Sequence, residues 1–140
     1  MVKKSIIGVM LTTFLVGTSA QAFGDDKPSA EVEKLKKQFI FTDKKKRCIN
    51  TRLIRSTRAI DDKNILFTLN GSTFYLNEME RKCPRLKFED RFTYTLRGTT
   101  QLCDVDIITV LDSFMNSFGS CGLGKFRELE KKPKEKQDKN

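Results

Sequence analysis

The chain has 140 residues with a formal net charge of +9, four cysteines and no histidine. This length allows a single domain. The lack of histidine disfavours triad-type hydrolysis and most proton-shuttle chemistry, and no serine or cysteine nucleophile has a recognisable partner base. The sequence therefore predicts no catalytic residue and no cofactor.

The first 22 residues have the pattern of a bacterial secretory signal peptide. Lys3 and Lys4 give a positive start, an apolar run covers residues 6–16, and Ala20 and Ala22 supply the small residues that signal peptidase reads. The apolar run is too short for a spanning helix, which needs about 20 residues. We therefore expect cleavage after Ala22, no membrane span, and a periplasmic or secreted location.

Four cysteines remain after cleavage: Cys48, Cys83, Cys103 and Cys121. An even count in a small exported chain indicates two structural disulfides. A zinc site is disfavoured because the spacings are long and histidine is absent, so we expect no metal ligands. Three pairings are possible. We favour Cys48–Cys121 with Cys83–Cys103, which would join the ends of the domain around a central hairpin.

A charged lead-in covers residues 23–47 and contains one expected helix. Ser29 is a suitable N-cap, and apolar residues from Val32 onward follow a helical period over residues 30–38. The hydrophilic run at 43–47 then marks a boundary before the first cysteine.

Short β-rich runs bounded by turn signals fill residues 48–126. In chain order we expect a candidate strand at 52–60, a turn at 61–64, and strands at 65–69 and 72–76 joined by the hairpin signal Asn70-Gly71. A helical turn at 77–82, a strand region at 86–96 broken near 89–90, a strand at 107–111, a loop at 112–120 and a closing segment at 121–126 follow. The pattern predicts a mainly β fold, a small antiparallel barrel or roll stapled by two disulfides, with one short N-terminal helix.

Residues 127–140 have the composition of a disordered, charged tail. The basic excess lies in the two flanks: the net charge is +1 for residues 48–124, +3 for 23–47 and +3 for 125–140. A dedicated nucleic-acid domain would carry this charge on its folded face, interleaved with aromatic residues. We therefore expect no specific nucleic-acid partner, and favour a solvated surface over weak attraction to anionic lipid head groups or other polyanions.

Arg52, Arg55 and Arg58 recur at every third position and are possible anion contacts, because arginine forms a good fork for carboxylate or phosphate. On a helix they would share a face, whereas on a strand Arg55 would oppose the other two.

Two pairs of carboxylates are candidates for a chemical site. Asp61-Asp62 lies in an expected turn, where aspartate bonds to the local backbone. Asp104 and Asp106 could hold a hard cation or act in hydrolysis, but without further oxygen ligands an ordinary strand entry is favoured.

The chain contains eleven phenylalanines, most of which we assign to the core. Phe114 and Phe118 fall in the expected loop at 112–120, where an exposed apolar patch would indicate a partner or ligand surface. The glycines that follow, up to Gly124, indicate turns and close backbone approach near a disulfide.

The order of several short motifs resembles a bacterial group of small exported proteins, the family catalogued as domain of unknown function 6491. The matching residues are Cys48-Ile49, Ile54-Arg55-Ser56, Asp61-Asp62, Tyr75, Cys83-Pro84-Arg85-Leu86, Leu102-Cys103, Asp106 with Ile108, and Cys121-Gly122-Leu123-Gly124. They cover residues 48–126, and the four-cysteine frame with C-P-x-L is the most specific part. Arg85 and Val105 depart from the pattern, since glycine is common at both positions. The resemblance implies an exported domain and transfers no catalytic residue.

Three functional hypotheses follow, in order of preference. The first is a non-enzymatic exported domain that binds an envelope protein or supports the envelope. The second is an anion-binding module for lipid head groups or polysaccharide. The third is a carboxylate-based hydrolase of envelope polymers that uses Asp104 and Asp106.

Overall fold

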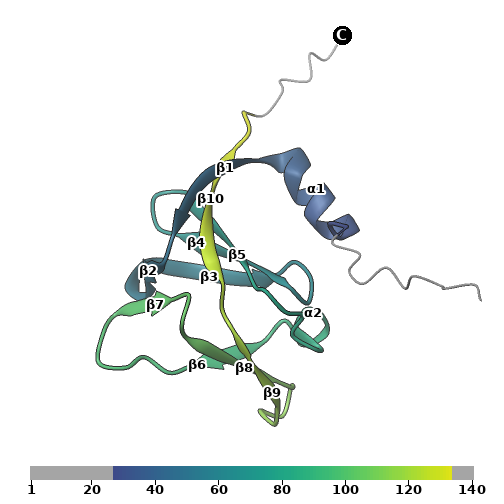
Figure 1. Cartoon of the computed structure of the whole chain (residues 1–140), viewed down its shortest axis with the longest axis vertical. Helices are drawn as coiled ribbons and strands as arrows, with labels where there is room; N and C mark the ends of the chain where they lie inside the picture. The colour runs from purple at the N-terminus through teal and green to yellow at the C-terminus, as the bar shows by residue number, and fades with distance from the viewer. Residues whose placement is uncertain (1–26, 134–140) are drawn as a thin grey trace, which may run out of the picture.

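The computed structural model describes residues 27–133, and the predicted leader with its cleavage site after Ala22 lies outside them. The described chain is mainly antiparallel β-structure, as predicted (Figure 1). Its elements are α1 (Ala30–Gln38), β1 (Phe39–Lys46), β2 (Cys48–Asn50), the 3-10 turn η1 (Thr51–Leu53), β3 (Ile54–Ala59), β4 (Asn64–Leu69), β5 (Thr73–Glu78), α2 (Leu86–Glu89), β6 (Phe92–Tyr94), β7 (Gln101–Cys103), β8 (Ile107–Leu111), β9 (Ser117–Gly122) and β10 (Lys125–Lys131).

Within residues 27–133 the strands form three open sheets, and the expected barrel is not closed. A five-stranded sheet has the order β1-β10-β5-β4-β3, a two-stranded sheet pairs β2 with β7, and a three-stranded sheet has the order β6-β8-β9. Helix α1 packs on one face of the five-stranded sheet, where Val32 and Leu35 meet Leu66 and Leu76. The two smaller sheets lie against the opposite face.

The central hairpin of β4 and β5 contributes side chains to two hydrophobic cores, one on each face of the five-stranded sheet. Along β4, Ile65 and Phe67 belong to the core shared with the small sheets, whereas Leu66 between them belongs to the core under α1. Successive side chains of a strand point to opposite faces, so this continuous apolar run is buried on both sides. The predicted hairpin is confirmed, with a three-residue turn in which Gly71 and Ser72 have positive φ.

The predicted helix is confirmed as α1, from Ala30 to Gln38. The Ser29 hydroxyl accepts a hydrogen bond from the Val32 backbone N–H at 3.3 Å, as expected for an N-cap. Glu31 and Glu33 in the first turn complement the positive end of the helix dipole.

Two disulfides are present, but the favoured pairing is wrong. Cys48 bonds to Cys103 and Cys83 bonds to Cys121, with Cα–Cα distances of 4.0 and 5.7 Å. The first bond follows from the pairing of β2 with β7, which sets Cys48 directly opposite Cys103. The two ends of the domain do meet, but through the pairing of β1 with β10. β1 precedes Cys48 and β10 follows Cys121, so no disulfide is involved in this contact.

The flanks contribute more structure than the sequence indicated. β1 runs through the expected hydrophilic boundary at 43–47 and pairs with β10, which continues to Lys131. The expectation of a disordered tail from residue 127 is therefore wrong for the first five residues, and residues 134–140 lie outside the described part. Pairing with β5 and β1 explains the difference, because it satisfies the β10 backbone and buries Leu129.

Three other local predictions are wrong. Residues 77–82 form no helical turn, since β5 extends to Glu78. Residues 86–89 form the short helix α2 where a strand was expected. The expected loop at 112–120 is shorter, because its last four residues begin β9 and pair with β8.

Candidate functional site

The β8–β9 hairpin is nearly free of charge in a strongly charged protein. Charged residues make up 32% of the chain. At that fraction about six would be expected among the eighteen residues from 107 to 124, but Asp112 is the only one. All residues from Ser113 to Ser120 are exposed. The hairpin therefore presents an uncharged surface to its surroundings.

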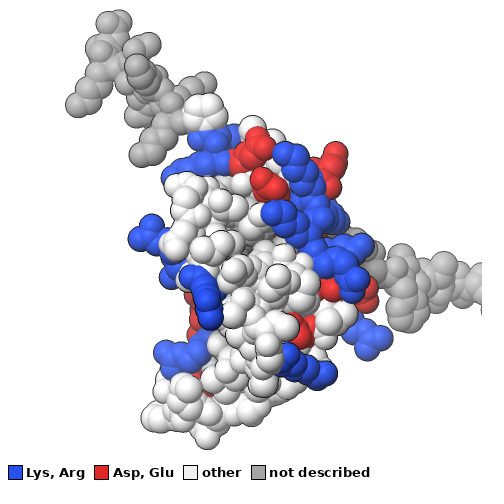
Figure 2. Space-filling view, turned by 90° about the vertical axis from the view of Figure 1, so that its left-hand side faces the viewer, with Lys and Arg blue, Asp and Glu red and all other residues white. Residues whose placement is uncertain are grey.

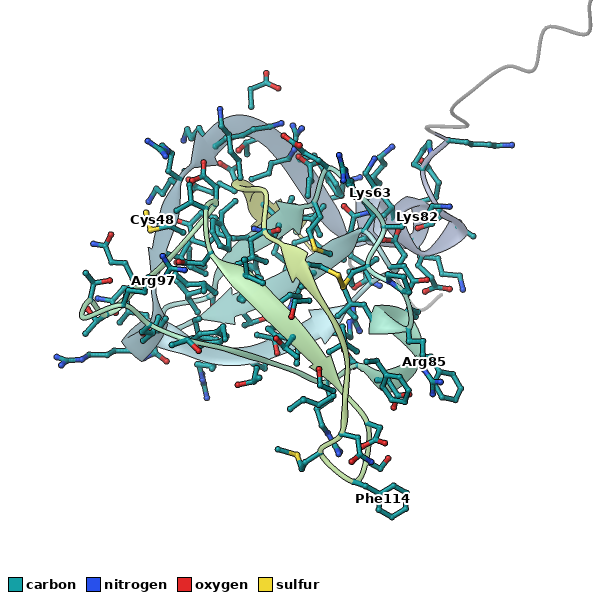
Figure 3. All side chains as sticks on the ribbon, turned by 60° about the horizontal axis from the view of Figure 1, so that its bottom comes forward. Cys48, Lys63, Lys82, Arg85, Arg97 and Phe114 are labelled. Carbon is teal, nitrogen blue, oxygen red and sulfur yellow. A yellow bond between two sulfur atoms is a disulfide. The ribbon has the colours of Figure 1, made fainter. Side chains whose placement is uncertain are left out.

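Four large apolar side chains are exposed in the turn of this hairpin, near the start of β9 or on α2, and we call them the apolar tip: Phe88, Phe114, Met115 and Phe118. Their exposed fractions are 81%, 86%, 66% and 45%. Phe114 projects from the hairpin turn, at the far end of the molecule from the body of the sheet (Figure 3). Scattered single apolar residues on a surface need no explanation, whereas a group of them marks an interaction site.

The turn that carries Phe114 and Met115 is fixed by Asp112. The carboxylate accepts hydrogen bonds at 2.8 Å from the backbone N–H groups of Phe114 and Asn116, and at 2.9 Å from the Asn116 side-chain amide. Met115 adopts a left-handed backbone with φ of 66°. The hydrogen bond from the Asn116 amide, supported by the two backbone bonds, holds the pKa of Asp112 below its usual value. The turn is thus ordered without burying its apolar side chains.

Arg85 connects the rest of the apolar tip. Its guanidinium lies 3.9 Å from the ring centroid of Phe118 and 5.5 Å from that of Phe88. The guanidinium also forms a 2.5 Å ion pair with the Glu89 carboxylate, which holds the Arg85 side chain in place. Cation–π contacts of this kind hold both rings near one charged group. The Cys83–Cys121 disulfide ties the same two segments together two residues away from Arg85.

The charges around the apolar tip cancel. The nearby basic residues are Arg85, Lys87 and Arg91, and the acidic residues are Glu89, Asp90 and Asp112. The basic excess lies instead at the opposite end, where β1 and β10 pair and so bring the two basic flanks of the sequence together. Figure 2 shows most of the blue side chains in the upper half of this face, with red ones among them, while the lowest part of the face is white. We call the end at which β1 and β10 pair the basic end.

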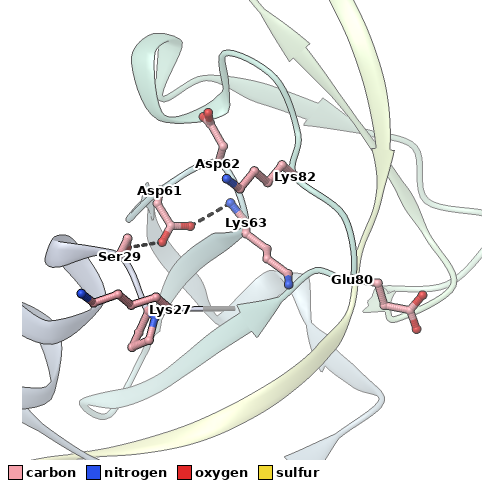
Figure 4. Close-up of a pocket in the computed structure, with 8 residues that line it drawn as sticks. Lys27, Ser29, Asp61, Asp62, Lys63, Glu80 and Lys82 are labelled. Atoms are coloured by element: carbon pink, nitrogen blue, oxygen red, sulfur yellow. Dashed lines mark hydrogen bonds between the residues drawn. The ribbon is translucent and has the colours of Figure 1, made fainter. Parts of the chain in front are cut away.

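A separate hollow of about 340 Å³ lies beside the start of α1 (Figure 4). Its lining contains three lysines and three acidic residues: Lys27, Lys63, Lys82, Asp61, Asp62 and Glu80. Asp61 accepts bonds from the Ser29 hydroxyl, the Lys63 N–H and the Asn64 amide. Asp62 accepts from the Lys87 N–H at 2.8 Å. The expected bonding to the local backbone is confirmed for Asp61, whereas Asp62 bonds to the backbone of α2, 25 residues along the chain. The balanced charge of the hollow favours neither an anion nor a cation.

The three arginines named as possible anion contacts are spread over different local structures. Arg52 lies in η1, Arg55 at a bulge where the register of β3 and β4 shifts, and Arg58 farther along β3. All three are exposed. Arg58 lines a hollow of about 160 Å³ together with Lys34 and Lys87 from α1 and α2. The spacing in the sequence therefore does not correspond to one shared helical face.

Asp104 and Asp106 are both engaged in local contacts. Asp104 forms an ion pair with Arg47 at 3.3 Å, and Asp106 accepts a 2.7 Å bond from the Cys103 N–H. Within residues 27–133, no group of three or more potential metal ligands occurs, and no helix is long and apolar enough to cross a membrane.

Phe114 and Phe118 were expected to be exposed, and the structure confirms both. Phe88 and Met115 were missed. The low charge of residues 107–124 is visible in the sequence and could have indicated Met115, whereas Phe88 lies in a charged stretch with no such signal. Comparison of the chain with protein-family models, with curated proteins and with solved structures found no match. The resemblance to domain of unknown function 6491 stays a prediction.

Proposed function

We propose that this protein is a non-enzymatic, disulfide-stabilised domain that works in the periplasm or outside the cell and binds an envelope protein through its apolar tip. The two disulfides support an oxidising compartment. The observation that carries the proposal is an ordered turn that holds Phe114 and Met115 in solvent. Aromatic residues and arginine are enriched at the energetic centres of protein interfaces, and a fixed surface loses little entropy on binding.

The charge balance of the apolar tip supports a protein partner over an anionic surface. Binding driven by apolar contact changes little with salt, whereas binding to a polyanion weakens steeply as salt screens the charges. We therefore expect the complex formed by the apolar tip to persist at high ionic strength.

Site-specific photocrosslinking in the cells that export the protein tests the proposal. A photoreactive amino acid at Ser113 lies beside Phe114 and leaves the apolar tip intact, and a control probe at exposed Lys37 lies on α1 at the other end. We expect a discrete protein adduct from position 113 and none from position 37. Phe114→Ser with Met115→Ser should remove the adduct. An identical pattern from both positions, or an adduct that survives the double substitution, contradicts the proposal.

Anion binding remains the second candidate, because β1 and β10 gather the basic flanks at one end. Several of these charges are already paired, including Lys34 with Glu31 and Lys45 with Glu78. Cosedimentation with vesicles that contain anionic lipid should fall steeply with salt if this end binds head groups. Lys37→Gln with Lys44→Gln should weaken such binding and leave the crosslink from position 113 unchanged.

A further inference from the structure

The exposed edges of the sheets differ in how they are protected against pairing with another strand. Such an edge carries a row of backbone N–H and C=O groups that can template a new strand. Proteins commonly protect edges with charge, short length or a covering segment. The end strands of the three sheets are β1 and β3, β2 and β7, and β6 and β9.

Five of the six edge strands show such protection. β1 carries Asp43 and the three lysines that follow it, whereas β2, β6 and β7 have only three residues each. β3 carries Arg55 and Arg58. The backbone at its last residue, Ala59, is also occupied: the N–H donates to Asp90 at 2.5 Å and the C=O accepts from the Lys87 amine at 3.1 Å.

β9 has none of these features. It is six residues long, Ser-Phe-Gly-Ser-Cys-Gly, without a charge or a proline. Within the part of the chain that the structure describes, it pairs only with β8, and every residue except the half-buried Cys121 is exposed. Alternate residues of an antiparallel edge strand direct their N–H and C=O groups away from the sheet. The outer edge of β9 is therefore uncharged and uncovered, and its register is regular from Gly119 to Gly122, with an irregularity between Ser117 and Gly119.

We propose that β9 pairs with β9 of a second copy of this protein, antiparallel about a two-fold axis. In such a symmetric pair the residues at the axis meet their own equivalents or near neighbours, and a residue farther out meets the one equally far on the other side of the axis. A strand with several like charges would therefore place like charges opposite or next to each other. The lysines of β1 and the arginines of β3 oppose self-pairing for this reason, and β9 carries no such repulsion. The three-stranded sheets of the two copies would join into one sheet of six strands, in the order β6-β8-β9-β9-β8-β6.

This arrangement leaves the turn that carries Phe114 and Met115 free to bind another protein, while Phe118 of the apolar tip lies on β9 itself. Phe114 and Met115 precede Ser117, the first residue of β9, so they lie beyond the end of the strand, whereas pairing would use the backbone along its side. Antiparallel pairing directs the two turns in opposite directions. The dimer would therefore carry two such turns, both accessible to partners.

Analytical ultracentrifugation of the exported protein from micromolar to millimolar concentration tests the proposal. We expect the mass to rise from that of one chain to that of two and then stay constant. Ser120→Lys places like charges across the pair and should raise the dissociation constant at least about tenfold. Ser56→Lys is the matched control, because Ser56 is an exposed serine on the edge strand β3. It should leave the dissociation constant unchanged.

Hydrogen exchange of the unsubstituted protein gives a second readout that no folding defect can confound. The amides of β9 should exchange more slowly at high protein concentration, whereas those of β3 should not change. A mass of one chain throughout the range, unlimited growth beyond two chains, equal effects of the two lysine substitutions, or concentration-independent exchange in β9 would each overturn the proposal. None of these outcomes bears on the crosslink from position 113.

Discussion

Gly124 is the position where one methyl group should do the most damage. A Cβ atom at this residue would lie 1.8 Å from the carbonyl oxygen and 2.7 Å from the carbonyl carbon of Glu78. Both atoms belong to the backbone of β5, so no side-chain rotation can relieve the contact. Gly124→Ala therefore requires β5 to move away from the segment that precedes β10.

The size of the effect follows from what that movement breaks. Real Cβ atoms essentially never approach other heavy atoms within 3.0 Å, so the two segments must separate by about 1.2 Å. The buried Asn77 side chain bridges the same gap: its amide donates to the Gly124 C=O at 2.6 Å, and its oxygen accepts from the Gly124 N–H at 3.0 Å. Losing both bonds leaves buried polar groups unpaired, at about 1–3 kcal/mol each. We expect a loss of about 2–6 kcal/mol.

Urea unfolding with both disulfides intact measures this loss, using far-ultraviolet circular dichroism. Gly122→Ala is the control, because nothing lies within 4 Å of its added methyl group and its φ is not positive. It should change the free energy of unfolding by less than about 0.5 kcal/mol. Asn77→Ala breaks the same two bonds, so the double substitution should cost less than the sum of the single ones. Equal stabilities for the two glycine variants would refute the reasoning.

Three further predictions concern a disulfide, the N-cap of α1 and the carboxylate of the hairpin turn. Replacing Cys83 and Cys121 together by alanine removes a crosslink over 38 residues, and chain entropy alone predicts a loss of about 4 kcal/mol in urea unfolding; a loss below about 1 kcal/mol would contradict it. Ser29→Ala removes the helix cap and should cost about 1 kcal/mol by the same assay, whereas an unchanged midpoint would show that the cap is dispensable. The folded-state pKa of Asp112 is lowered, so its contribution is present above the usual aspartate pKa and is lost as the pH falls through the folded value. Amide chemical shifts of the hairpin turn should report this titration below the usual aspartate range, and a midpoint above that range would contradict it.

Local signals predicted the elements that depend on local physics. The cap and apolar period of α1, the hairpin of β4 and β5, and the β-branched run of β8 were each readable from neighbouring residues. The elements that were missed depend on distant partners. β1 contains three consecutive lysines and shows no strand pattern, yet β10 supplies the hydrogen bonds that make it a strand.

The same limit applies to the disulfides and to the candidate site. The observed cysteine pairing requires knowing that Cys48 and Cys103 lie opposite each other across β2 and β7, and both strands are only three residues long. Phe114 and Phe118 could be named from their loop-like context. The contacts of Arg85 with Phe88 and Phe118 bring α2 and β9 together, and no local pattern encodes this proximity.

The interleaved order of the disulfides keeps the protein in one covalent piece after a single proteolytic cut between Cys48 and Cys121. Along the chain the cysteines alternate between the two bonds, since Cys48 joins Cys103 and Cys83 joins Cys121. Any single peptide bond cut between Cys48 and Cys121 separates the partners of at least one bond, so the two pieces stay covalently linked. Interactions made by the β8–β9 hairpin or by the basic end can therefore persist after one peptide bond in an exposed turn is cut. Mass spectrometry of the nicked protein would find a mass one water above the intact chain until a reductant is added.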